Sequence, residues 1–320
     1  MSGNAAPALP PLDVFLQGHR ARVDDALDRY LPSSPSSPAL VSDAMRYSVF
    51  AGGKRLRPIL ALAAAEAVSG AASRSQSQAV ELALPAGCAI EMIHTYSLIH
   101  DDLPAMDDDT LRRGRPTLHV VYGDGIAILA GDGLHAEAFT LLAREPVSDD
   151  PVIGARKLEV LRLIGEAAGP AGMVGGQTID LQAAGQVPGH ALTLDVEGLR
   201  AMHARKTGAL IQASALSGAI MAGATIEQRA GLDRYGTELG LAFQIVDDIL
   251  DVEGTAAELG KSSGKDAAGS KPTYPSLVGL DRSRALARDC VSRAEAALAD
   301  AGLAASQLAA IARWVVTRTH

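Results

Sequence analysis

The chain has 320 residues, of which 48% are hydrophobic and only 3% aromatic, and its formal net charge at pH 7 is -8. This surplus of negative charge excludes a general nucleic-acid surface, so any bound anion must meet a local cluster of Lys and Arg. Recurring runs of Ala and Leu favour closely packed helices over sheets, and we expect one large helical core.

Helical periodicity covers almost the whole chain. Helices are expected at 12–31, 39–51, 55–70, 76–103, 124–145, 151–168, 171–184, 195–223, 226–252, 282–300 and 303–317. No stretch alternates convincingly at the two-residue period of a strand. The breaks between the windows are short and none resembles a domain linker, which predicts a single domain over 1–320 with a flexible N-terminal tail at about 1–11.

Three segments bear on whether the protein enters a membrane, where it resides and whether it has a lid. The window 209–226 is about long enough to span a bilayer, but it carries Gln212, small hydroxyls and glycines, so we expect a buried core helix and no transmembrane segment. The N-terminus lacks the basic start and apolar centre of a secretory signal, and the two cysteines lack any metal spacing, which favours a reducing cytoplasm. The Gly-, Ser- and Lys-rich stretch 253–275 is too long for a plain connection and is typical of a functional lid.

Five aspartates fall between positions 101 and 109, directly after an apolar helical window. Asp101 and Asp102 stand at the end of that helix, because Pro104 cannot continue the helical hydrogen bonds. The next turn brings Asp107, Asp108 and Asp109 back toward them. We therefore expect a group of oxygen ligands at this helix end.

A second acidic cluster lies in FQIVDDILD at 243–251. Asp247, Asp248 and Asp251 are three and four residues apart, so on a helix they share one face and repel each other. A helix N-cap or a solvated acidic face would be the ordinary explanation, but apolar residues surround these carboxylates nearly all round the helix. Carboxylates in such surroundings need a cationic partner.

Oxygen ligands without His or Cys suit Mg²⁺, which completes its octahedron with water and phosphate oxygens, whereas the spacing of a calcium-binding EF-hand is absent. Several basic segments could clamp the phosphates. These are GGKRLRP at 52–58, RRGRP at 112–116, RKTG at 205–208 and the lysines Lys261, Lys265 and Lys271. No nucleotide-binding P-loop or Rossmann fingerprint occurs, so the pattern indicates a metal-bound polyphosphate whose remaining part is apolar.

Six segments together resemble the trans-prenyltransferases, or isoprenyl diphosphate synthases, and most closely the bacterial farnesyl diphosphate synthases. They are HDDLPAMDDDTLRRGRP, FQIVDDILD, GGKRLRP, RKTG, GGQTIDL and GKSSGKD, which follow the family order over nearly the whole chain. The resemblance implies an all-α fold, a bundle of mostly antiparallel helices around a deep central cavity, usually assembled as a homodimer.

The resemblance also implies roles for individual residues. Asp101 and Asp107 would hold two Mg²⁺ ions and Asp247 a third, with Asp102, Asp248 and Asp251 in support. The allylic diphosphate would meet Arg112, Lys206, Lys261 and Lys271, and isopentenyl diphosphate would meet Lys54, Arg57, His94 and Arg113. Thr207 and Gln244 would flank the reacting carbons, and together with Lys206 they would form the catalytic group.

The implied reaction is the Mg²⁺-dependent condensation of isopentenyl diphosphate with dimethylallyl and geranyl diphosphate to (2E,6E)-farnesyl diphosphate, in which Mn²⁺ could substitute. Tyr96 and Ser97 precede Asp101 by five and four residues, about 6 to 8 Å deeper along a helix. A tyrosine there resembles the cavity floor of farnesyl-forming enzymes, although Tyr96 could also be a plain core residue. A geranylgeranyl diphosphate synthase, a terpene cyclase and a non-catalytic partner subunit stay open as alternatives.

Overall fold

The computed structural model describes residues 9–72, 75–253 and 272–318. Lys261, Lys265 and Lys271, most of the expected lid at 253–275 and most of the expected N-terminal tail lie outside the described residues. The statements below therefore concern the three described ranges.

The described residues form helices with one very short hairpin, which confirms the all-α class. The helices are α1 (Leu12–Tyr30), α2 (Ala39–Val49), α3 (Leu56–Ala71), α4 (Gln76–Asp101), α5 (Leu118–Tyr122), α6 (Asp124–Arg144), α7 (Pro151–Ala168), α8 (Met173–Ala183), α9 (Val196–His203), α10 (Ala209–Ala222), α11 (Ile226–Glu253), α14 (Tyr274–Val278), α15 (Leu280–Asp300) and α16 (Gln307–Thr317). A π-helical turn, Ala204–Gly208, joins α9 to α10, and β1 (Leu111–Arg112) pairs antiparallel with β2 (Arg115–Pro116).

The expected windows agree with the long helices to within a few residues, and the differences fall on short elements. The hairpin β1–β2 and the five-residue helices α5 and α14 were not predicted, because two to five residues carry no measurable hydrophobic period. The window 195–223 is helical throughout but contains the π turn, which widens the helix where it carries Lys206.

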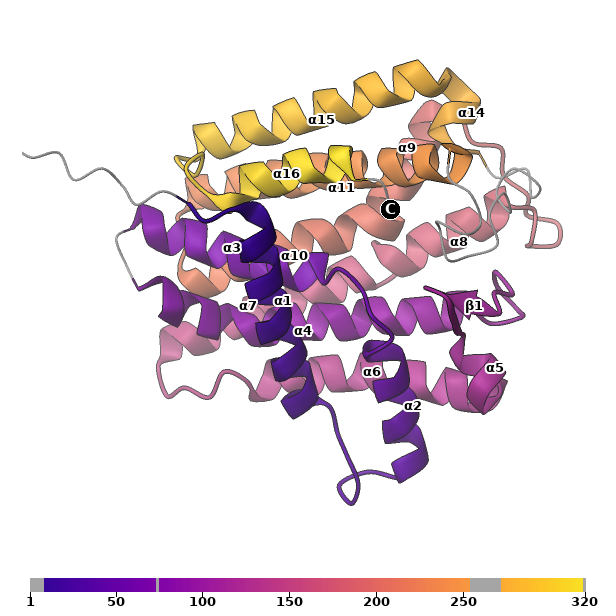
Figure 1. Cartoon of the computed structure of the whole chain (residues 1–320), viewed down its shortest axis with the longest axis horizontal. Coiled ribbons are helices and arrows are strands. Elements are labelled where there is room, and N and C mark those ends of the chain that lie inside the picture. The colour runs from indigo at the N-terminus through magenta and orange to yellow at the C-terminus, as the bar shows by residue number, and fades with distance from the viewer. Residues whose placement is uncertain (1–8, 73–74, 254–271, 319–320) are drawn as a thin grey trace, which may run out of the picture.

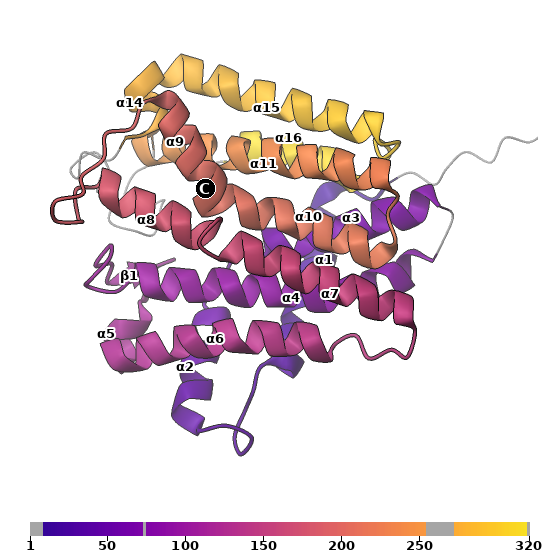
Figure 2. The same ribbon diagram turned by 180° about the vertical axis from the view of Figure 1, so that it is seen from behind.

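The long helices α3, α4, α6, α7, α10, α11 and α15 lie side by side, and α1 and α2 cross them steeply (Figures 1 and 2). Helix α10 is buried nearly all round and packs on α3. A Cβ atom at Gly218 would lie 1.8 Å from the carbonyl oxygen of Ala61, so the two backbones touch. The prediction of a buried core helix at 209–226 is confirmed for α10.

Two described helices, α4 and α6, are long and apolar enough to cross a membrane by length and composition alone. In α4, 78% of the most apolar window is buried inside the protein, as in a core helix. In α6 only 39% of that window is buried, and Ile128 and Leu129 are 44% and 56% exposed. Helix α6 therefore presents an apolar face to the surface.

Several segments that the sequence analysis singled out gather at one end of the bundle. The C-terminal ends of α4 and α11 lie at the same end as the hairpin β1–β2 and α8 (Figure 1). Helix α4 carries the first aspartate cluster and α11 the second, so the fold brings two clusters that are far apart in sequence to one region.

Candidate active site

The first aspartate cluster is built by a turn that folds back on the end of α4. The amide of Asp107 donates to the carbonyl of Asp101 at 2.9 Å, and the amide of Asp109 donates to the carbonyl of Asp102 at 3.2 Å. Burial raises the pKa of Asp101 to about 6; the charge of Lys206 opposes this shift and that of Asp107 adds to it. The cluster thus places buried negative charge close to a cation, and the structure brings Asp101, Asp107 and Lys206 together.

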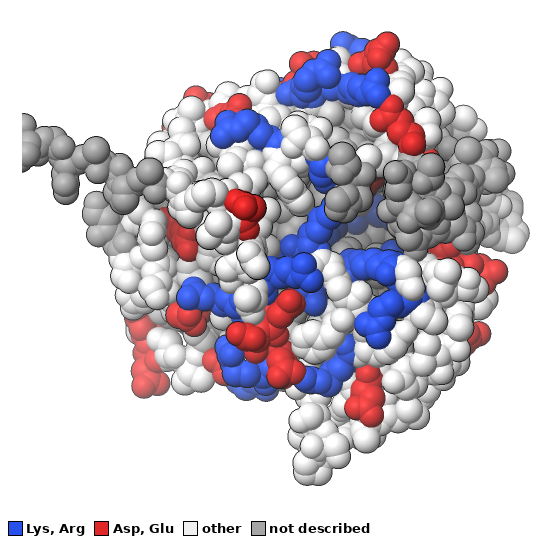
Figure 3. All heavy atoms as spheres, in the orientation of Figure 1, with Lys and Arg blue, Asp and Glu red and all other residues white. Residues whose placement is uncertain are grey.

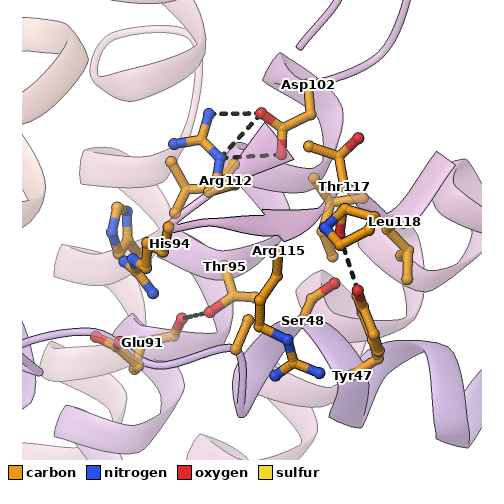
Figure 4. A pocket seen from close by; sticks show the side chains of 15 residues that line it. Tyr47, Ser48, Glu91, His94, Thr95, Asp102, Arg112, Arg115, Thr117 and Leu118 are labelled. Atoms are coloured by element: carbon orange, nitrogen blue, oxygen red, sulfur yellow. Dashed lines mark hydrogen bonds and ion pairs between the residues drawn. The ribbon is translucent and has the colours of Figure 1, made fainter. Parts of the chain in front are cut away.

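Asp102 and Arg112 form an ion pair beside this cluster. The Nε atom of Arg112 donates to both carboxylate oxygens of Asp102 at 2.9 Å, and Nη2 donates to Oδ1 at 2.5 Å (Figure 4). The turn of the hairpin makes this ion pair possible. Arg113 and Gly114 adopt positive φ angles of 54° and 74°, so the side chains of Arg112 and Arg113 point to different partners. A predicted metal-supporting residue and a predicted diphosphate-binding residue therefore bind each other.

A pocket between α2, α4 and the hairpin is lined by His94, Glu91, Asp102, Arg112 and Arg113, among others (Figure 4). On the molecular surface, Lys and Arg side chains gather around a hollow near the middle of one face (Figure 3). An acidic protein needs such a local basic cluster to bind an anion.

Of the four residues predicted to bind isopentenyl diphosphate, Lys54, Arg57 and Arg113 carry positive charge into this region, and His94 lies among them. Burial lowers the pKa of His94 well below its usual value, and the charges of Arg57 and Arg113 lower it further. Burial, followed by the charge of Arg318, lowers the pKa of Lys54. The Nε atom of Arg57 is buried without a hydrogen-bond partner among the described residues. An anion would relieve this mutual repulsion.

A buried ion pair beneath this basic group was missed in the sequence. Arg55 donates to Glu91 at 2.9 Å, to Asp24 at 2.8 Å and to the carbonyl of Val49 at 2.6 Å. Its backbone has a φ of 54°, so the loop before α3 is held in an uncommon conformation. Arg55 lies within GGKRLRP, but nothing in that motif distinguishes a structural arginine from a ligand-binding one.

In the second cluster, Asp248 faces the protein interior. Its Oδ2 accepts the backbone amide of Tyr274 at 2.9 Å, and its Oδ1 accepts the side-chain amide of Gln244 at 3.4 Å. Burial raises the pKa of Asp248 to about 7 despite these hydrogen bonds. Asp248 thereby anchors α14, while Asp251, one turn further along α11, is half-buried.

Asp247 is paired with a residue from the end of the described chain. The Nη2 atom of Arg318 donates to Oδ1 of Asp247 at 2.6 Å and to the carbonyl of Phe243 at 3.1 Å. The guanidinium also lies 4.0 Å from the centre of the Phe243 ring, and its side chain is only 6% exposed. This contact could not be predicted from the sequence, because it joins residues 71 positions apart.

The π turn places Lys206 against α8. Its Nζ atom lies 2.5 Å from Oδ2 of Asp180, a buried residue of the GGQTIDL segment. Thr207, the next residue, is half-buried. Asp180 was not among the predicted site residues.

Tyr96 lies deeper along α4 than Asp101. Its side chain is buried, with the ring centre 4.7 Å from that of His135 and 5.7 Å from that of His100. Burial, with a smaller effect of Asp101, raises the pKa of Tyr96 to about 12, so the phenol is neutral. The Ser97 hydroxyl donates to the carbonyl of His94 within the helix.

The carboxylates fit a hard divalent cation that is shared with phosphate oxygens. No group of three or more His, Cys, Asp or Glu in the described ranges could hold a metal by itself. Instead, each cluster offers one or two carboxylates, and burial penalises the charge of Asp101 until a cation balances it. This is the donor set expected for Mg²⁺, which prefers few protein ligands and several phosphate or water oxygens.

Comparisons with known proteins agree with this geometry. The polyprenyl synthetase family model matches residues 38–305. The chain is 42% identical over 309 residues to a farnesyl diphosphate synthase of Geobacillus stearothermophilus, which covers 97% of this chain and 98% of the relative. It is also 42% identical over 308 residues to a geranylgeranyl diphosphate synthase of Cyanophora paradoxa, which covers 96% of each chain.

A solved structure is similar over the same length. The Helicobacter pylori geranyltransferase, complexed with magnesium and isoprenyl diphosphate, superposes with a TM-score of 0.81 at 29% sequence identity. The match covers 98% of this chain and 99% of that chain. The chain therefore belongs to the polyprenyl synthetase family and is a prenyltransferase.

Proposed function

We propose that this prenyltransferase condenses isopentenyl diphosphate with dimethylallyl diphosphate, and then with geranyl diphosphate, to give (2E,6E)-farnesyl diphosphate. One observation carries the choice of product. The buried ring of Tyr96, held between His100 and His135, stands five residues before Asp101 on the same helix. That spacing is about 7.5 Å of helix rise, so Tyr96 would limit the depth available to a growing chain.

The allylic diphosphate would bind at the first aspartate cluster. Lys206 already lies close enough to Asp101 to influence its pKa, and Arg112 stands beside Asp102. Cationic side chains at this position stabilise negative charge as the allylic C–O bond breaks. The departing diphosphate can then take the proton lost after the new bond forms, so no protein nucleophile is needed.

Isopentenyl diphosphate would bind among Lys54, Arg57, His94 and Arg113. Burial and mutual repulsion lower the pKa values of these groups, which is the condition that a bound diphosphate would relieve. A terpene cyclase, which acts on one diphosphate, has no need of a second basic group. This cluster therefore favours a two-substrate condensation.

We propose Mg²⁺ as the cofactor, with three ions per site and with Mn²⁺ able to substitute. Asp101 and Asp107 would hold two ions, and Asp247 a third after Arg318 has moved away. When bound, the ions would neutralise charge on the leaving diphosphate. Asp102, Asp248 and Asp251 would support these ligands. Asp102 would act through its ion pair with Arg112, and Asp248 through its hydrogen bond with the backbone amide of Tyr274.

Geranylgeranyl diphosphate synthase is the second candidate, because the Cyanophora paradoxa relative of that name is as similar as the farnesyl-forming one. The test incubates purified protein with Mg²⁺, isopentenyl diphosphate and either dimethylallyl or geranyl diphosphate, and separates the dephosphorylated products by carbon number. Farnesol as the main product supports the proposal. Geranylgeraniol would keep the reaction and overturn the product. Turnover of geranyl diphosphate alone would indicate a cyclase, and binding without turnover would indicate a partner subunit.

We further propose a cytoplasmic homodimer in which a second copy covers the apolar face of α6. Ile128 and Leu129 expose apolar side chains there, and Val121 of the adjoining α5 is 46% exposed. An exposed apolar surface of this kind is typical of an association site. Light scattering coupled to size-exclusion chromatography should give twice the 33.0 kDa chain mass. Ile128→Asp with Leu129→Asp should give a monomer, and unchanged dimers would exclude this surface.

A further inference from the structure

The GGQTIDL segment of α8 has no role in the proposed function so far. It carries Asp180, a carboxylate only 5% exposed, whose Oδ2 lies 2.5 Å from the Nζ atom of Lys206. A buried carboxylate is stable only when a cation or hydrogen bonds balance its charge. Here the balancing cation is a lysine that the proposed reaction uses.

Helix α8 also fixes the backbone of the same lysine. A Cβ atom at Gly176 would lie 2.2 Å from the backbone nitrogen of Lys206 and 2.5 Å from its Cα. Only a glycine allows the two segments to approach so closely. Gly176 and Asp180 are one turn apart on α8, so one face of this helix holds both the backbone and the side chain of Lys206.

The surroundings of the pair favour an oriented ammonium group. Burial lowers the pKa of His203 to about 3, so this neighbour is neutral and does not compete with Lys206 as a cation. Gln177 precedes Asp180 by three residues and therefore lies near the same face of α8. Its amide atoms are buried without a hydrogen-bond partner among the described residues, as expected of a side chain that contacts a ligand. The face of α8 that holds Lys206 thus borders the site.

We propose that Asp180 is a positioning residue, which holds the Lys206 ammonium in the orientation that meets the allylic diphosphate. This inference rests on the proposed function, because it assumes that Lys206 binds that diphosphate. A lysine side chain has four rotatable bonds, and fixing it before the substrate arrives removes part of the cost of ordering it during the reaction. A purely structural counter-ion would balance charge without affecting one substrate more than the other.

The test compares Asp180→Asn, Lys206→Met and the double variant with the wild-type protein. The assay measures kcat and KM for geranyl diphosphate and for isopentenyl diphosphate with Mg²⁺, together with the thermal midpoint. Asp300→Asn is the matched control, because Asp300 forms an exposed ion pair with Arg234 away from the site. Asp180→Glu keeps the charge and moves the carboxylate by one methylene.

We expect Asp180→Asn to lower kcat/KM for geranyl diphosphate roughly 10- to 100-fold, while KM for isopentenyl diphosphate stays within about twofold. In the double variant the two losses should not multiply, because Asp180 acts through Lys206. Multiplied losses, or a rise in KM for isopentenyl diphosphate as large as that for geranyl diphosphate, would overturn the proposal. If Asp180→Asn does not fold, Asp180→Glu decides, since wild-type kcat in that variant would also overturn it.

The design separates this inference from the proposed function. A wild-type protein that makes no prenyl product contradicts the proposed function. In that case calorimetry would test the inference by measuring the Mg²⁺-dependent binding of geranyl diphosphate. Asp180→Asn must weaken this binding if the inference holds. A wild-type protein that turns over normally, with an equally active Asp180→Asn variant, contradicts the inference alone.

Discussion

At the residue scale, the ring of Tyr96 is expected to decide between a C15 and a C20 product. Tyr96→Ala removes a buried ring that packs on His100 and His135, and opens space one and a half helical turns below Asp101. We expect the main product to lengthen from C15 to C20, as measured by chromatography of the dephosphorylated alcohols. Unchanged C15 products would mean that another wall sets the length and that Tyr96 is a plain core residue.

Asp101 and Asp247 are both expected to matter for rate, and Asp101 is expected not to matter for folding. Asp101→Ala and Asp247→Ala should each lower kcat by about 10³-fold or more, because each removes a proposed metal ligand. Burial already penalises the charge of Asp101, so its removal should leave the thermal midpoint unchanged or higher. Steady-state kinetics with Mg²⁺ and a thermal melt check both statements. Turnover near the wild-type rate in either variant would refute the metal assignment.

The buried His203 makes the free energy of unfolding depend on pH in the acidic range. Burial lowers its pKa to about 3, whereas the unfolded chain takes up a proton near the usual value of about 6.5. Between these values the unfolded state binds more protons, so the free energy of unfolding falls as pH falls, by at most about 1.4 kcal/mol per pH unit. Above about pH 6.5 this contribution is constant.

His203→Gln should therefore flatten the loss of stability between pH 6 and pH 4, measured by urea unfolding at several pH values. His190→Gln is the control, because His190 is exposed. Equal slopes in His203→Gln and in the wild-type protein would show that another group dominates the acid response.

At the element scale, close packing of α10 on α3 depends on Gly218. A Cβ atom there would lie 1.8 Å from the backbone oxygen of Ala61, and a backbone atom cannot move aside cheaply. Gly218→Ala should destabilise the protein by about 1–3 kcal/mol, even though alanine favours a helix. In Gly154→Ala the added Cβ meets no atom within 4 Å, so this variant should be neutral or up to about 1 kcal/mol more stable. Urea unfolding of both variants checks the difference, and equal stabilities would mean that α3 and α10 separate without cost.

At the scale of the whole molecule, Arg318 links the C-terminal region to the second aspartate cluster. In the structure its guanidinium binds Asp247, so a metal ion held by Asp247, as we propose, would have to displace it. Arg318→Ala should raise the affinity for Mn²⁺, in the presence of pyrophosphate, about fivefold, or on the order of 1 kcal/mol. Electron paramagnetic resonance of free Mn²⁺ measures this directly.

Arg313→Ala is the matched control for this prediction, because Arg313 lies on α16, the helix that directly precedes Arg318, and pairs with Glu295 at the surface. That variant should bind Mn²⁺ as the wild-type protein does. An unchanged affinity in Arg318→Ala would show that Asp247 is not a metal ligand or that its ion pair opens without cost.

The sequence by itself determined the long helices and the two acidic segments that are proposed to carry the chemistry. Hydrophobic period and local spacing are properties of neighbouring residues, so the long helices and the positions of Asp101 and Asp247 could be predicted within single segments. The family order of the motifs then supplied the expected roles, and the comparisons confirm the family.

Only the tertiary structure decided which charged groups meet. Asp102 binds Arg112, Asp180 holds Lys206, and Arg318 reaches Asp247, over separations of 10, 26 and 71 residues. A run of aspartates or arginines does not indicate its partners, because pairing depends on how helices pack and on how far burial penalises an unbalanced charge. Asp180 and Arg318 could therefore not be recognised until the bundle placed them beside Lys206 and Asp247.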